Sequence, residues 1–131
     1  MNPEAAPTVL VVDDEEIVCM FVLAALQQRG YRVLSANRGE AGLRCFSDNQ
    51  AEISLVISDV VMPDISGYKM VEGIRNIRPD IPVLFITGTM QELPGWARET
   101  CCVLRKPFTL NILMCGVEEC LASRRKSRRA E

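Results

Sequence analysis

Residues 8–16 read TVLVVDDEE, a largely apolar run that ends in four consecutive acidic side chains. The run does not alternate between apolar and polar residues, which is typical of a strand that is covered on both faces. Like charges a few ångströms apart repel one another, and burial raises the cost of ionising them, so this arrangement lowers stability unless a cation offsets it. We infer that the acidic end of this strand belongs to a site.

Four further short apolar runs follow along the chain at regular intervals. They span residues 31–35, 53–58, 82–87 and 101–104. Each is rich in aliphatic and β-branched residues, and none alternates with polar ones. The sequence therefore predicts five buried strands.

Segments with helical spacing lie between these runs. In the first of them Ile17, Phe21, Ala24 and Ala25 recur at intervals of three and four residues, and Gly30 supplies a stop. This spacing predicts a helix whose apolar face includes those four side chains.

Four more helices are predicted, one after each remaining strand. Asn37 and Glu40 have the spacing of a capping box and predict the start of the second helix. Residues 66–76 and 110–121 carry apolar side chains on one helical face. Pro94-Gly95 interrupts the fourth helical segment, which we expect to be short or broken.

Strand and helix alternate five times, which indicates an α/β domain with a parallel sheet and helices on both faces. In such sheets the reactive crevice lies beyond the carboxyl ends of the strands. Asp13, Asp14, Asp59, Thr87 and Lys106 each follow or end a predicted strand. We therefore expect three carboxylates, a hydroxyl and an ammonium group at one rim of the sheet.

This set of groups suits phosphoryl transfer. Three carboxylates form a plausible Mg²⁺ site. Asp59 is the candidate nucleophile, because a carboxylate attacks a phosphoryl group once positive charge neutralises the space between them. Lys106 supplies a fixed positive charge, and the Thr87 hydroxyl can donate a hydrogen bond to a phosphoryl oxygen.

Four motifs in order resemble the receiver domain of two-component response regulators. They are VVDDE at 11–15, ISDVVMPDISG at 57–67, FITG at 85–88 and LRKPF at 104–108. The resemblance covers residues 8–122. It implies a doubly wound, flavodoxin-like domain with strand order 2-1-3-4-5 and five helices.

The resemblance also implies roles for individual residues. Asp59 would accept a phosphoryl group from a histidine kinase or a His-containing phosphotransfer protein, and Thr87 and Lys106 would hold the phosphoryl oxygens. The implied Mg²⁺ ligands are the side chains of Asp14 and Asp59, the backbone carbonyl of Val61, and Asp13 through water. The Lys106–Pro107 bond would be cis.

Two departures from the family pattern accompany the resemblance. Val103 stands where receivers commonly have an aromatic switch residue, and Pro94-Gly95 alters the surface that receivers use for dimers or output partners. The motif at 103–108 is similar to receivers attached to hybrid histidine kinases. A homodimer and the identity of the output partner are left open.

Two other functions compete with the phosphoacceptor. A pseudo-receiver would bind partners without phosphorylation. A phosphatase with an aspartyl nucleophile would need a second aspartate two residues past Asp59, where Val61 stands. We expect no enzyme that turns over an external substrate.

The length and composition of the chain limit the domain organisation and the location that we expect. The chain of 131 residues has room for one ordinary domain, so we expect an extension at 1–7, a receiver domain at 8–122, and a basic, disordered tail at 123–131. The tail holds five basic residues, but we do not expect it to bind nucleic acid or a membrane. No signal peptide is recognisable, and the six cysteines lack metal-site spacing, so we expect a cytoplasmic protein whose cysteines are mostly small core residues.

Overall fold

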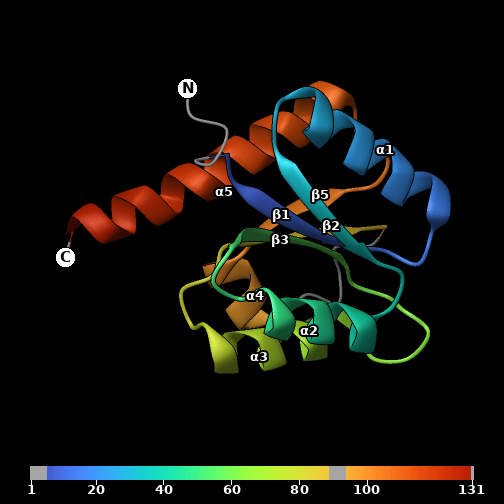
Figure 1. The fold of residues 1–131 in the computed structure, drawn as a ribbon, viewed down its shortest axis with the longest axis horizontal. Coiled ribbons are helices and arrows are strands. Elements are labelled where there is room, and N and C mark those ends of the chain that lie inside the picture. The colour runs from blue at the N-terminus through green and yellow to red at the C-terminus, as the bar shows by residue number, and fades with distance from the viewer. Residues whose placement is uncertain (1–5, 89–93, 131) are drawn as a thin grey trace.

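Five parallel strands form the centre of the molecule, and helices cover both faces of the sheet (Figure 1). The computed structural model describes residues 6–88 and 94–130, the side chains of 124–130 excepted. The strands are β1 (Thr8–Val12), β2 (Arg32–Ala36), β3 (Ile53–Asp59), β4 (Val83–Thr87) and β5 (Cys102–Arg105). The helices are α1 (Glu16–Gln28), α2 (Gly39–Asp48), α3 (Gly67–Ile77), α4 (Gly95–Thr100) and α5 (Leu110–Ala130). The strand order is β2-β1-β3-β4-β5, so the predicted fold is confirmed.

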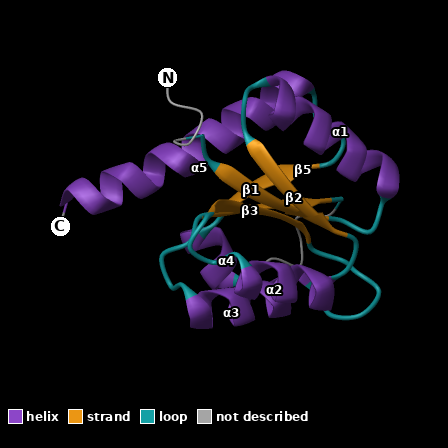
Figure 2. Ribbon diagram, viewed as in Figure 1, coloured by secondary structure: helices purple, strands orange, loops and turns teal. Residues whose placement is uncertain are grey.

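The two faces of the sheet carry separate apolar cores. Figure 2 shows α1 and α5 on one face and α2, α3 and α4 on the other. Leu26, Leu84 and Leu113 belong to the cluster under α1 and α5. Phe46 and Phe85 belong to the cluster under α2, α3 and α4. Because both faces are covered, the interior strands lack the alternation of a one-sided sheet.

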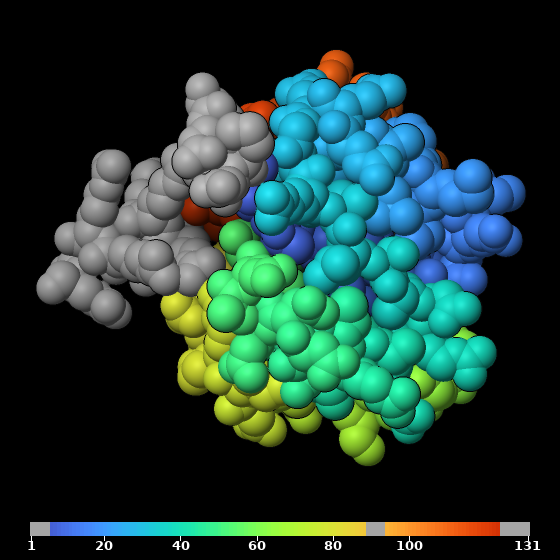
Figure 3. All heavy atoms as spheres, viewed as in Figure 1, coloured from blue at the N-terminus to red at the C-terminus, as the bar shows by residue number. Residues whose placement is uncertain are grey.

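The prediction of five buried strands is right for the interior strands and wrong for the edges. Every residue of β1 and β4 is buried, and so are all but one of β3. The edge strands β2 and β5 are partly exposed instead. Atoms of the β2 region, cyan in the space-filling view, reach the molecular surface (Figure 3). An edge strand has a neighbour on one side only, so water reaches its side chains.

The predicted apolar face of α1 is wrong. The structure buries Val22, Ala25 and Leu26, whereas Ile17 is 84% exposed and Phe21 is 43% exposed. The helix is apolar around most of its circumference, so periodicity alone does not select the face that packs against the sheet. Of the four side chains expected on that face, the structure buries Ala25 alone.

The predicted capping box of α2 is also wrong. The N-cap residue is Arg38, which makes no side-chain capping bond. The carboxylate of Asp64, in the loop after β3, instead accepts hydrogen bonds from the backbone N–H of Gly39 (2.9 Å) and Glu40 (2.8 Å). Desolvation would raise the pKa of Asp64, but backbone N–H groups, that of Glu40 foremost, outweigh it and lower the pKa to about 2.

The last two helices differ in how they match the sequence. α4 has only six residues and begins after Pro94, so the short fourth helix is confirmed. α5 continues to Ala130, through the stretch where a disordered tail was expected. Alanine, arginine and lysine are good helix formers, so the backbone there can stay helical without an apolar stripe. The proposed division into domains stays a prediction.

The cysteines are less buried than expected. Of the six, Cys120 on α5 is buried, and its sulfur lies in contact with that of Cys102 on β5, with Cα atoms 6.4 Å apart. Eighteen positions separate the two residues in the chain, so their spacing carries no motif. The packing of α5 against β5 brings them together.

Candidate functional site

The predicted site residues meet at the carboxyl ends of four neighbouring strands. Asp13 and Asp14 follow β1, Asp59 ends β3, Thr87 ends β4, and Lys106 follows β5. β1 lies beside β3, and β4 lies between β3 and β5, so the parallel order delivers all of them to one rim.

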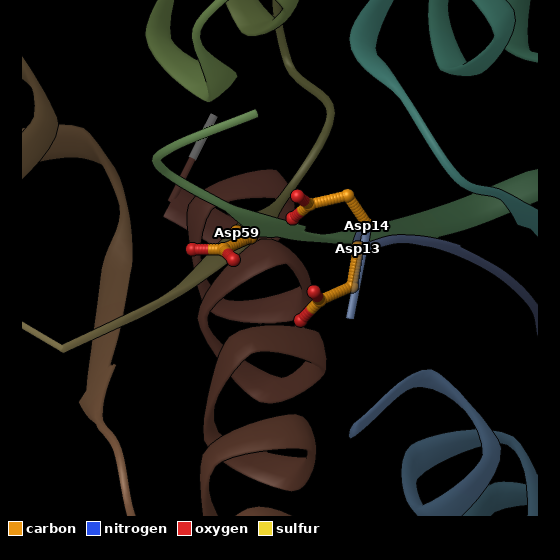
Figure 4. A group of neighbouring side chains, drawn as sticks. All are labelled: Asp13, Asp14 and Asp59. Carbon is orange, nitrogen blue, oxygen red and sulfur yellow. The ribbon is translucent and has the colours of Figure 1, made fainter. Parts of the chain in front are cut away.

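Three carboxylates form the acidic part of this rim. Oxygen atoms of Asp13, Asp14 and Asp59 lie within 4.8 Å of one another. Asp13 and Asp59 are buried and Asp14 is exposed, so the group opens to solvent on one side. Figure 4 shows the three side chains grouped where β1 and β3 end. Carboxylate oxygens in this number and spacing are the ligands that Mg²⁺ prefers.

Asp13 carries an oxygen suited to a cation. Its Oδ1 accepts the backbone N–H of Glu15 (2.8 Å), but its buried Oδ2 accepts no hydrogen bond from the residues that the structure describes. Desolvation, helped by the Asp59 charge, raises the pKa of Asp13 to about 6, although the Glu15 hydrogen bond and the nearby Lys106 oppose the shift. A buried carboxylate oxygen is costly unless a positive charge lies close to it, and the ammonium of Lys106 lies 3.4 Å from this one. The acidic group therefore fits a divalent cation.

Asp59 is held from several directions. Its Oδ1 accepts the backbone N–H of Val60 (2.7 Å), and its backbone carbonyl accepts the hydroxyl of Ser58 (2.7 Å). The chain then folds back, because the N–H of Gly67 donates to the carbonyl of Val60 (2.7 Å). A Cβ atom on Gly67 would overlap the carbonyl oxygen of Asp59. Only glycine permits this approach, which positions the strand end that carries Asp59.

Lys106 is the cation of the site. Its Nζ lies 3.0 Å from Oδ2 of Asp59, 3.4 Å from Oδ2 of Asp13 and 2.9 Å from Oε1 of Glu15. Burial works to lower the pKa of Lys106, but its bonds to Glu15 and Asp59 and the nearby negative charges raise it above the ordinary value. The ammonium group therefore stays charged at neutral pH.

The loop after β5 aligns this lysine. The backbone N–H of Lys106 donates to the carbonyl of Thr87 (2.8 Å), which ties the end of β5 to the end of β4. The Lys106–Pro107 bond is cis, as expected. Thr87 itself is buried beside the site. Val61, two residues past Asp59, exposes its side chain in the β3–α3 loop.

Sequence reasoning missed one functional contact, the pairing of Glu15 with Lys106. Glu15 stands in the acidic run, but the sequence pattern does not distinguish it from Glu16. The direction in which the chain turns into α1 decides which of the two faces Lys106, and local sequence does not encode that direction.

Comparison with known proteins agrees with this geometry. The family model for the response regulator receiver domain matches residues 9–117. The sensor kinase CckA of Brucella abortus is 38% identical over 119 residues, which are 87% of this chain and 12% of the kinase. The response regulator SaeR of Staphylococcus epidermidis is 29% identical over 90% of this chain and 52% of the regulator. The chain thus spans a small part of the kinase and about half of the regulator.

Solved structures give the same result. The receiver domain of the hybrid histidine kinase CckA is 33% identical, with a TM-score of 0.76 over 87% of this chain and 98% of that domain. A response regulator receiver domain protein from Clostridium thermocellum is 29% identical, with a TM-score of 0.79 over 91% of this chain and 97% of that one. With its motifs, its strand order and the matched family model, this chain belongs to the response regulator receiver domain family of two-component systems.

Proposed function

We propose that this receiver domain accepts a phosphoryl group on Asp59 from a phosphohistidine donor, in a reaction that depends on Mg²⁺. One observation carries the proposal. The carboxylate of Asp59 belongs to an acidic group that fits a divalent cation, and the ammonium of Lys106 lies 3.0 Å from one of its oxygens. Negative charge that enters this space meets positive charge on both sides.

The transfer is a single displacement at phosphorus. A carboxylate oxygen of Asp59 attacks, the bond from phosphorus to the imidazole nitrogen breaks, and its electron pair leaves with the imidazole. Lys106 and the hydroxyl of Thr87 bind the phosphoryl oxygens. Asp14, Asp59 and the carbonyl of Val61, with Asp13 through water, would hold a Mg²⁺ ion, which would supply positive charge next to those oxygens.

Exposed apolar side chains near the site support a protein as the donor. Ile17 and Met20 are exposed on the first turns of α1, directly after the acidic run, and Leu110 and Ile112 are exposed on the first turn of α5. Exposed apolar side chains beside a site offer a surface for contact with a protein. The similar receiver of CckA is part of a hybrid histidine kinase, which supports a histidine kinase or a phosphotransfer protein as partner.

We propose a cytoplasmic location and no turnover of an external substrate. No helix in the described part of the chain has both the length and the apolar content that crossing a bilayer requires. The exposed side chain of Val61 has no acid or base to serve a phosphatase, and this disfavours that alternative. The close approach of Lys106 to Asp59 disfavours a pseudo-receiver, because it preserves the phosphoacceptor geometry.

The test uses a small phosphodonor. With acetyl phosphate and Mg²⁺, the intact mass of the protein should gain one phosphoryl group, and EDTA should prevent this. Asp59→Asn is the matched control and should gain none. Labelling of wild type and Asp59→Asn to the same extent would refute the assignment. A protein whose NMR spectrum in Mg²⁺ does not change when beryllofluoride is added would be a pseudo-receiver instead.

A further inference from the structure

Among the residues that the structure describes, Lys106 contacts one carboxylate that lies outside the acidic group of Asp13, Asp14 and Asp59. We propose that this residue, Glu15, is a positioning residue: it gives the ammonium of Lys106 a partner at the mouth of the site, so that a divalent cation can bind the acidic group without losing Lys106. This inference rests on the proposed function, since it concerns the same site.

The lysine and a bound cation compete for the same oxygens. Nζ of Lys106 lies 3.0 Å from Oδ2 of Asp59 and 3.4 Å from Oδ2 of Asp13, and both carboxylates belong to the acidic group. Two positive charges a few ångströms apart repel one another strongly where water is partly excluded. The ammonium must therefore loosen its hold on at least one of these oxygens when a cation arrives.

Glu15 is placed to receive the ammonium group. Its Oε1 lies 2.9 Å from Nζ of Lys106, and its side chain is 60% exposed, whereas that of Lys106 is 17% exposed. The Glu15 contact thus lies on the solvent side of the lysine, and the Asp13 contact lies on the buried side. A small movement of the ammonium toward Glu15 would free Asp13 and keep the charge at the rim.

The backbone holds both partners in place. The N–H of Glu15 donates to Oδ1 of Asp13 (2.8 Å), and the N–H of Lys106 donates to the carbonyl of Thr87 (2.8 Å). Glu15 is the N-cap residue of α1, but its side chain makes no capping bond. The carboxylate of Glu15 is therefore not needed to start the helix, and the interaction that the structure shows for it is the ion pair with Lys106.

Glu16 offers a matched control. It is adjacent, equally charged and exposed, and it makes no ion pair among the residues that the structure describes. Removing either glutamate takes one negative charge from the neighbourhood of the acidic group. Only removal of Glu15 also takes a partner from Lys106.

The experiment measures Mg²⁺ affinity by titration calorimetry in a double-mutant cycle. The proteins are wild type, Glu15→Ala, Glu16→Ala, Lys106→Gln and the double variant Glu15→Ala with Lys106→Gln. Glu15→Ala should weaken Mg²⁺ binding about two- to fivefold, the size expected for a partly exposed ion pair. Glu16→Ala should have a clearly smaller effect. In the Lys106→Gln background, Glu15→Ala should have no more effect than Glu16→Ala has in wild type.

The outcomes separate this role from simple charge and from the proposed function. The positioning role would be overturned if Glu15→Ala and Glu16→Ala weakened Mg²⁺ binding equally. It would also be overturned if Glu15→Ala weakened Mg²⁺ binding as strongly in the Lys106→Gln background as it does in wild type. Thermal melts in EDTA check that the variants fold. If wild type binds Mg²⁺ and is phosphorylated on Asp59, but Glu15→Ala does not change Mg²⁺ affinity, only the role of Glu15 is refuted. If wild type binds no Mg²⁺, both proposals are overturned.

Discussion

At the scale of single residues, Asp13 shows how the site departs from what stability alone would select. Its carboxyl group is buried, and one of its oxygens accepts no hydrogen bond from the described part of the chain. Desolvation raises its pKa from 3.8 to about 6, although the hydrogen bond from Glu15 opposes the shift. The folded protein therefore holds a proton on Asp13 more tightly than the unfolded chain does.

This shift predicts a pH dependence of stability in the absence of metal. Between pH 3.8 and about 6 the folded state binds the additional proton, so the contribution of Asp13 to the free energy of unfolding falls as pH rises through this window. We expect a loss of about 1 kcal/mol, smaller than the pKa shift alone would imply, because water at the open side of the site screens the charge.

The measurement is urea unfolding in EDTA at several pH values for wild type and Asp13→Asn. The difference in the free energy of unfolding between the two proteins should change across the window from pH 4 to 7, since only wild type ionises at this position. A difference that is constant with pH would show that Asp13 does not titrate there.

At the scale of elements, the start of α2 is capped by the carboxylate of Asp64, which is distant in sequence. Asp64 accepts the N–H groups of Gly39 and Glu40, which have no partner within the helix. This contact joins the start of α2 to the loop that follows Asp59, so it also fixes that loop. The loop after β3 thus serves both the site and a helix terminus.

We predict that Asp64→Ala lowers the free energy of unfolding at neutral pH. The pKa of Asp64 is lowered from 3.8 to about 2 in the folded state, so its contribution is present above pH 3.8 and is lost as pH falls through about 2. The gap between wild type and Asp64→Ala, read from thermal melts, should therefore narrow between pH 4 and pH 2.

Glu72→Ala is the control, since Glu72 is an exposed acidic residue in the middle of α3. Its substitution should change stability little. If Asp64→Ala and Glu72→Ala behaved alike at neutral pH, the carboxylate of Asp64 would not be the cap of α2.

At the scale of the whole molecule, the packing of α5 beside α1 closes one face of the sheet. α5 buries Leu113, Met114, Val117 and Cys120 against this core, while its neighbouring Ile112 is 50% exposed. The helix thus presents adjacent residues to opposite environments.

Leu113→Ala should lower the free energy of unfolding by about 2 to 5 kcal/mol, because it leaves a cavity in the core. Ile112→Ala, one position earlier, should stay within about 0.5 kcal/mol of wild type. Chemical denaturation of both variants measures the two values. Similar losses for the two would mean that α5 docks in a different rotation.

The fold and the reacting groups were predictable because they depend on local patterns. Apolar runs and helical spacing predict the order of elements, and parallel strands carry the residues at their ends to one rim. Asp13, Asp14, Asp59, Thr87 and Lys106 all meet there in the structure.

The sequence by itself thus determined the fold class, the strand order through the family motifs, and the rim on which the charged groups lie. Only the tertiary structure decided which face of α1 is buried, that Asp64 caps α2, that Cys102 meets Cys120, and that Glu15 rather than Glu16 reaches Lys106. Each of these depends on how segments far apart in the chain pack together, and packing chooses between neighbouring residues that local sequence leaves equivalent.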